Sequence, residues 1–206
     1  MYLPKHFAED DISEIHALMR AHPLATLISH GPDGLNANHI PLLLGDAAPC
    51  GKLQGHVARA NPLWKPGEVV GEVLVVFQGD ESYISPSGYA TKAEHGKVVP
   101  TWNYAAVHAY GEMTVIDDPA WVLDQVSTLT SIHEAMLPKP WAVGDAPADY
   151  IEKMLGAIVG IEIRINRLLG KWKVSQNQPA ENRASLIAVL EKASDPMAGL
   201  IRARQQ

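Results

Sequence analysis

The sequence has a single cysteine, Cys50, among its 206 residues. An internal disulfide framework is therefore excluded, and the composition favours a reducing compartment. Long hydrophobic runs are also missing, since no apolar stretch approaches the roughly 20 residues that a membrane-spanning helix needs. The first residues, MYLPKHFAEDD, lack the basic-then-apolar layout of a signal peptide. We therefore expect a cytoplasmic protein that does not cross a membrane.

An excess of positive charge is missing too. The chain has 17 Lys and Arg against 23 Asp and Glu, which gives a net charge of -6. The chain as a whole therefore has no electrostatic attraction to nucleic-acid phosphates, and this argues against direct DNA binding. A local basic patch formed by Arg183, Arg202 and Arg204 would leave such binding open, although a solvated helix face also explains these residues.

Common catalytic and nucleotide-binding signatures are absent as well. The sequence has no phosphate-binding P-loop, no G-x-G-x-x-G fingerprint and no G-x-S-x-G nucleophile elbow. His133 and Glu134 begin a zinc-protease pattern, but Leu137 stands where its second histidine belongs. His39, His56 and His108 lie on different predicted strands without the close spacing of typical metal ligands, so no metal site is predicted.

The pattern of apolar and turn residues predicts a mainly β protein. A helix follows a cap at Asp10 or Asp11 and ends before Pro23. Alternating or β-branched segments predict strands at 24–30, 35–45, 51–61, 72–85, 98–116 and 159–176. Two glycines are expected to interrupt them: Gly79 divides the segment 72–85, and Gly170 forms the turn of a strand pair within 159–176. Residues 86–97 are expected to form a loop.

The order of these elements favours an antiparallel barrel with helices packed outside it. Most strands are joined by short turns without regular crossover helices, which argues against a doubly wound parallel sheet. We expect one domain over residues 1–206, with a helical insertion at 117–158 and a C-terminal helical extension at 179–206.

Polar and aromatic residues interrupt or end several predicted strands. They occur in four clusters: Asn38 and His39; His56, Arg59 and Asn61; Thr101, Trp102 and Asn103; and Trp172, Lys173, Ser175 and Gln176. Each cluster alone is explained by strand ends at the solvent-exposed rim. Together they also predict a shared cleft, in which an Arg fork suits a phosphate and aromatic rings suit a flat ring system.

The motifs that contain these clusters also carry a family resemblance. GHVARANPLW, FQGDESYISPSGY, VPTWNYAAVHAYG and KWKVSQNQP, together with NHIPLLL and the opening MYLPKHFAEDD, span nearly the whole chain. In this order they resemble the PaiB-type family of FMN-binding negative transcriptional regulators. The resemblance implies an antiparallel FMN-binding split β-barrel, similar in fold to pyridoxamine-phosphate oxidases and flavin reductases. It further implies a homodimer with FMN at the subunit interface.

The resemblance implies specific cofactor-binding residues. Arg59 and Asn61 would lie at the flavin phosphate, with His56 at a neighbouring position of the same strand. The remaining residues would lie along the ring and ribityl chain or line the same cleft, with the last three contributed by the partner subunit: Asn38, His39, Pro41, Trp102, Asn103, Lys171, Trp172 and Gln176. This chain has Gln178 at a position where the family pattern tends to have a basic residue.

Two classes of function remain open from the sequence. One is an FMN-binding regulator, which is supported by the family resemblance alone. The other is an FMN-dependent reductase or oxidase, in which the cofactor carries the chemistry and no catalytic motif needs to appear. Binding or breakdown of haem is a weaker alternative, because some split barrels use this cleft for haem.

Overall fold

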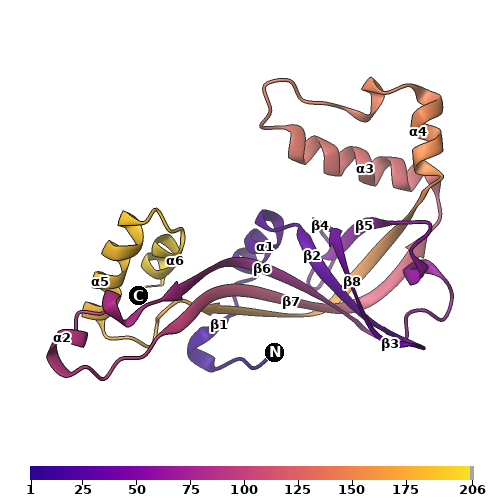
Figure 1. Cartoon of the computed structure of the whole chain (residues 1–206). Helices are drawn as coiled ribbons and strands as arrows, with labels where there is room; N and C mark the ends of the chain where they lie inside the picture. The colour runs from indigo at the N-terminus through magenta and orange to yellow at the C-terminus, as the bar shows by residue number, and fades with distance from the viewer. Residues whose placement is uncertain (205–206) are drawn as a thin grey trace. The chain divides into compact units, whose positions relative to one another are not determined.

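The computed structural model describes residues 1–204, and contact density divides them into two compact units. Unit 1 consists of Met1–Ala21, Gln78–His108 and the chain from Leu169 onward, whereas unit 2 consists of His22–Phe77 and Ala109–Leu168. Three long strands contribute residues to both units: β6 (Val73–Ile84), β7 (Thr101–Ile116) and β8 (Ile158–Lys173). These strands run alongside one another in the sheet (Figure 1).

The sheet of the described residues has eight strands and is not closed, as expected for a split barrel. Its order is β3-β2-β6-β7-β8-β5-β4, with β1 (Ala8–Glu9) paired to β8 beside this path. The other strands are β2 (Leu24–Gly31), β3 (Gly34–Pro41), β4 (Leu43–Gly45) and β5 (Lys52–Ala58). Every pairing whose register is known is antiparallel, so the predicted fold class, an antiparallel split β-barrel with helices, is confirmed.

Unit 2 contains the predicted hairpin. Strands β2 and β3 pair from Leu24↔Pro41 to Gly31↔Gly34, around the Pro-Asp turn that the sequence indicates. Side chains of the neighbouring strands alternate between the two faces of the sheet, and those on the core face are fully buried: Phe77 of β6 and Ile161 and Ile163 of β8. The segment predicted as one strand at 35–45 instead breaks at Leu42, and β4 pairs with β5.

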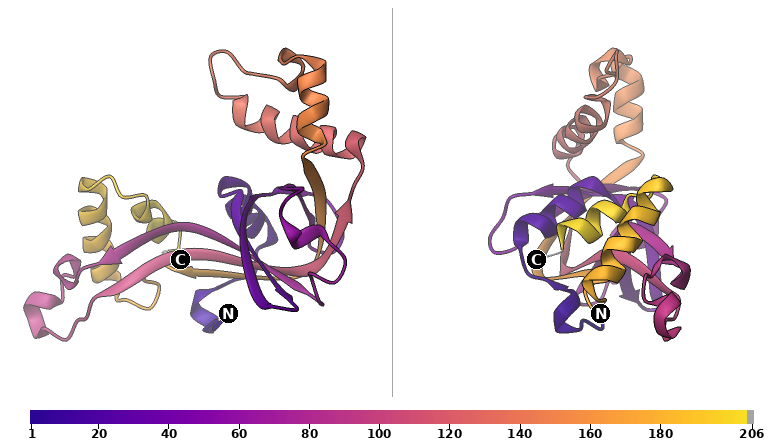
Figure 2. Two further views of the ribbon diagram at one scale, coloured as in Figure 1. Left: turned by 45° about the vertical axis from the view of Figure 1, so that its right-hand side comes forward. Right: turned by 90° about the vertical axis from the view of Figure 1, so that its left-hand side faces the viewer.

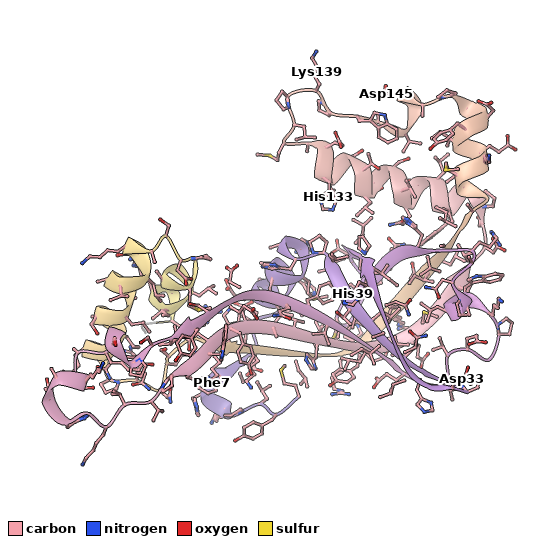
Figure 3. All side chains as sticks on the ribbon, in the orientation of Figure 1. Phe7, Asp33, His39, His133, Lys139 and Asp145 are labelled. Carbon is pink, nitrogen blue, oxygen red and sulfur yellow. The ribbon has the colours of Figure 1, made fainter. Side chains whose placement is uncertain are left out.

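Unit 2 also contains the helical arm, which we define as residues 117–157. It comprises α3 (Pro119–Glu134), the short η4 (Val143–Asp145) and α4 (Ala148–Leu155). Asp118 caps α3 by accepting a hydrogen bond from the Ala120 backbone N–H at 2.9 Å, with Pro119 at the first helical position. The arm occupies the predicted insertion; its labelled side chains His133, Lys139 and Asp145 come from α3, the connection after it and η4 (Figure 3).

Unit 1 contains helices from both ends of the described chain and from its middle segment. These are η1 (Lys5–Phe7), α1 (Ile12–Ala21), η3 (Pro86–Gly88), α2 (Lys92–His95), α5 (Ala180–Lys192) and α6 (Met197–Ala203). Helices α5 and α6 pack against each other (Figure 2) and bury Leu186, Met197 and Ile201. The loop expected at 86–97 is in fact partly helical. A further short helix, η2 (Pro62–Trp64), belongs to unit 2.

Two glycines interpreted as strand breaks are buried within continuous strands. A Cβ on Gly79 would lie 3.0 Å from Leu18 Cδ1, and one on Gly170 would lie 2.8 Å from the Glu9 carbonyl oxygen. These positions therefore need glycine because α1 and β1 approach closely, and not because the chain turns there. Both predicted breaks are wrong: β6 and β8 each continue without interruption.

None of the helices within residues 1–204 is both long enough and apolar enough to cross a membrane.

Candidate functional site

The residues predicted to bind the cofactor divide between the two units. Unit 2 contains Asn38, His39, Pro41, His56, Arg59 and Asn61, and unit 1 contains Trp102, Asn103, Lys171, Trp172 and Gln176. Within unit 2, Asn38, His39 and Pro41 lie on β3, where His39 and Pro41 are exposed (Figure 3). Contacts join several members of each group inside their own unit.

Arg59 lies one residue beyond the end of β5 and binds the base of the helical arm. Its two terminal nitrogens donate to the Asp117 carboxylate at 3.0 and 2.6 Å, and its Nε donates to the Gly156 carbonyl oxygen at 2.9 Å. This bidentate pair raises the pKa of Arg59 and lowers the pKa of Asp117. Arg59 therefore links the two ends of the arm to β5.

Asn61 and His56 are also paired inside unit 2. Asn61 Oδ1 accepts from the Leu63 backbone N–H at 3.0 Å and so caps η2, while Asn61 Nδ2 donates to Asn38 Oδ1 at 2.7 Å. His56 Nδ1 lies 2.8 Å from Gln125 Oε1 of α3. The polar side chains in and after β5 thus make separate contacts to β3 and to the arm.

The predicted residues of unit 1 range from exposed to fully buried. Trp102 is 54% exposed and lies edge-on to Tyr83, with 5.7 Å between the ring centroids. Trp172 is buried beneath the Arg204 guanidinium, which lies 5.4 Å from its ring centroid. Lys171 is buried as well, and its ammonium donates to the Tyr2 carbonyl oxygen at 3.1 Å. Of the two tryptophans, only Trp102 presents its ring to solvent.

Asn103 and Gln176 hold the chain around the end of β8. The buried Asn103 amide donates to Ser175 Oγ at 2.9 Å. Gln176 folds back to accept from the Val174 backbone N–H at 2.8 Å and to donate to the Trp172 carbonyl oxygen. Ser175 between them has a left-handed backbone with φ of 64°, a conformation that a non-glycine residue keeps only when its surroundings hold it.

Asn103 also lines a small polar cavity, which we call the donor pocket. Its volume is about 140 Å³, and it is lined by Tyr89, Val99, Thr101, Asn103, Lys173, Ser175, Asn177 and Gln178. From the sequence, Lys173 and Ser175 are predicted as polar strand-end residues without a role at the cofactor, and Tyr89 has no predicted role. For Lys173 the sequence does contain a signal. Residues two apart on a strand share a face of the sheet, so Lys173 lies on the same face as Lys171, which is predicted to bind the cofactor.

Burial shifts the acidity of two groups in this pocket. It raises the pKa of the Tyr89 phenol, an effect that the neighbouring Ser175 partly opposes. It lowers the pKa of the Lys173 ammonium; Lys171 adds to this effect and Tyr104 opposes it. Both groups are hydrogen-bond donors in their protonated forms.

The helical arm carries a larger and more apolar groove within unit 2. Its volume is about 770 Å³, and it lies between α3, η4 and α4, with Leu123, Val143 and Ile151 among its lining residues. Across residues 1–204, no group of three or more His, Cys, Asp or Glu side chains could hold a metal ion.

Comparison with known proteins relates the chain to flavin-binding families. Residues 1–167 match the family described as "Putative FMN-binding domain". A protein of Aspergillus fumigatus is 36% identical over 93% of this chain and 91% of its own length. Protease synthase and sporulation protein PAI 2 of Bacillus subtilis is 29% identical over 96% of this chain and 93% of its own length.

Among solved structures, the FAD and heme binding protein from Mycobacterium smegmatis has a similar fold, with a TM-score of 0.57. The likeness covers 81% of this chain and 73% of that chain, at 16% sequence identity. This likeness supports the split-barrel architecture, and the match over residues 1–167 supports the cofactor that the sequence motifs predicted. The chain therefore belongs to the PaiB-type family of FMN-binding proteins.

Proposed function

We propose that this protein is a cytoplasmic flavoprotein that binds FMN as a homodimer and acts in gene regulation through another factor. The observation that carries the proposal is the family match over residues 1–167, which includes both β5 with Arg59 and β7 with Trp102. Bound FMN would supply electron or hydride transfer at its ring, and the protein would supply position and electrostatics.

The residues of unit 1 suit such a cofactor. Trp102 offers an exposed aromatic face of the kind that stacks on a flat ring. The donor pocket supplies the Lys173 ammonium together with hydroxyl and amide groups, which are the groups that bind an anionic end. Its volume of about 140 Å³ lies well below the roughly 300–1,000 Å³ of a site that encloses a whole ligand. The ring would therefore lie outside this pocket.

The residues of unit 2 suit a phosphate less directly. Arg59 has five N–H donors, and in this structure its guanidinium already contacts Asp117 and the carbonyl oxygens of Gly156 and Ile158. A phosphate at Arg59 would have to displace the Asp117 carboxylate. The assignment of Arg59 and Asn61 to the phosphate remains a prediction that a variant can test.

A regulatory role is supported by the Bacillus subtilis relative, whose name refers to protease synthesis and sporulation. The net charge of -6 favours an indirect effect, because direct DNA binding generally relies on Lys and Arg neutralising phosphates. Homodimer formation is supported by large apolar side chains that are exposed on the helical arm, such as Ile132 at 56% and Met136 at 90%.

The cofactor proposal is tested by titrating the purified apoprotein with FMN and following the quenching of flavin fluorescence. We expect a saturable signal at micromolar concentration and a yellow protein with flavin absorbance. Haem titration serves as the comparison. A Soret band with no flavin signal would contradict the proposal and favour the haem alternative.

The regulatory proposal is tested on the FMN-loaded protein. We expect no consumption of NADH or NADPH above that of free FMN, and no mobility shift of promoter DNA at physiological salt. Rapid, saturable NAD(P)H oxidation would instead identify a reductase. A DNA shift that weakens steeply with salt would identify direct DNA binding.

A further inference from the structure

The donor pocket contains a buried hydroxyl that lacks a hydrogen-bond partner. Tyr89 is only 5% exposed, and its phenol oxygen makes no hydrogen bond of normal geometry to any described group, although Ser175 lies nearby. Such a group is costly to bury, because its desolvation is not compensated. A ligand bound in this cavity can accept a hydrogen bond from the Tyr89 hydroxyl.

Other groups at the pocket also have donor capacity left. The Lys173 ammonium donates to Thr101 Oγ1 and to the Trp102 carbonyl oxygen, which uses two of its three N–H bonds. Ser175 Oγ accepts from Asn103, and this leaves the serine hydroxyl hydrogen able to donate. Together with Tyr89, these groups give three donors from two segments of unit 1 that lie far apart in the sequence.

The charge of the pocket selects the sign of its ligand. Among the described residues that line it, Lys173 is the one charged side chain, and none is a carboxylate. The remaining polar lining consists of hydroxyl and amide groups. A cation would meet an ammonium there, whereas an oxyanion would pair with the ammonium and accept from the hydroxyls.

We propose that the donor pocket is an oxyanion site, in which Lys173, Tyr89 and Ser175 bind a single phosphate group. The volume of about 140 Å³ is large enough for one phosphate group and too small for a flavin ring. The phosphate belongs either to FMN or to a small free phosphate. The first case rests on the proposed function and places the phosphate of FMN in unit 1. The second case does not depend on the proposed function.

Riboflavin separates the two sources, because it has the ring of FMN without the phosphate. The experiment measures FMN and riboflavin affinities by fluorescence quenching, and measures stabilisation by inorganic phosphate from the thermal unfolding midpoint. The variants are Lys173→Gln, which removes the charge, and Tyr89→Phe, which removes only the unpartnered hydroxyl. Lys192→Gln on α5 and Tyr150→Phe on α4 are the matched controls, because both side chains are exposed and lie outside the pocket.

If the phosphate is that of FMN, Lys173→Gln weakens FMN binding about tenfold or more and leaves riboflavin binding unchanged. Tyr89→Phe weakens FMN binding about threefold to tenfold. If the phosphate is free, FMN affinity is unchanged, but both variants lose the stabilisation by inorganic phosphate that the wild type shows. The two control variants behave as the wild type in every assay.

Tyr89→Phe also separates a ligand role from a structural one. Without ligand, its unfolding midpoint is equal to or above that of the wild type, because a buried unsatisfied hydroxyl has been removed. A lower midpoint combined with unchanged ligand affinities would assign Tyr89 to structure alone. The proposal is overturned if neither variant changes FMN affinity or phosphate stabilisation. A wild type that is stabilised by phosphate but does not bind FMN would refute the proposed function while supporting the pocket.

Discussion

At the scale of single residues, Arg59 has two competing roles that one pair of variants can separate. Its guanidinium joins Asp117 at the start of the helical arm to the carbonyl oxygens of Gly156 at the arm's end and of Ile158 at the start of β8. We expect both Arg59→Ala and Asp117→Asn to loosen the arm, because each breaks the bidentate pair. Arg59→Ala should loosen it more, because it also removes the hydrogen bonds to Gly156 and Ile158. Faster amide hydrogen exchange in α3 and α4 would report this loosening.

The double variant provides the control. Its exchange rates should match those of Arg59→Ala, because Asp117 contacts Arg59 and loses that contact once Arg59 is replaced. Unchanged rates in Arg59→Ala would refute the anchoring role. FMN affinity completes the comparison: if Arg59 binds the cofactor phosphate, Arg59→Ala weakens FMN binding and Asp117→Asn does not.

At the scale of elements, close packing of α3 on β8 depends on a glycine. A Cβ on Gly160 of β8 would lie 2.5 Å from Trp121 Cζ3 and 2.9 Å from the Ile116 carbonyl oxygen. We expect Gly160→Ala to lower the free energy of unfolding by about 1–3 kcal/mol, because overpacking forces the neighbours to move. Urea denaturation followed by tryptophan fluorescence measures the change.

Gly144→Ala in η4 is the matched control, since a Cβ there would meet no atom within 4 Å and its backbone φ is not positive. Its effect should stay within about 0.5 kcal/mol. If both substitutions lower the free energy of unfolding by the same amount, the contact between Trp121 and Gly160 does not explain why glycine is needed there.

The elements also show what the sequence could and could not predict. Alternating apolar residues located nearly all the strands, and the Asp118–Pro119 signal placed the start of α3. Gly79 and Gly170 were misinterpreted because local pattern treats glycine as a turn signal, whereas tertiary crowding by α1 and β1 requires it here. The partner of Arg59 could not be predicted either, since Asp117 is 58 residues away and its approach depends on the sheet.

The donor pocket shows the same division between local and tertiary information. The sequence indicated that the ends of β7 and β8 are polar, and Asn103 was assigned to the cofactor. It could not reveal that the Tyr89 hydroxyl is buried without a partner, because the pocket around it is lined by two segments of unit 1 that lie far apart in the sequence.

At the scale of the whole molecule, the protein should be a dimer in solution. The helical arm exposes Ile132, Met136 and Leu137, apolar side chains that a subunit interface would cover. We expect light scattering to give twice the 22.4 kDa mass of one chain over a wide concentration range. A mass of one chain at micromolar concentration, with or without FMN, would contradict the dimer and the interface site that depends on it.

The composition of unit 1 from three separated segments has a consequence for biosynthesis. Its first segment, Met1–Ala21, is made early, but its sheet partner in β8 and the helices α5 and α6 come only from Leu169 onward. On the ribosome, Ile15 of α1 therefore lacks its neighbour Gly170 until most of the chain has been translated, whereas Leu18 can already meet Gly79. Chaperone contact with nascent chains should accordingly be strongest at this N-terminal segment, and it should end when the final strand and helices emerge.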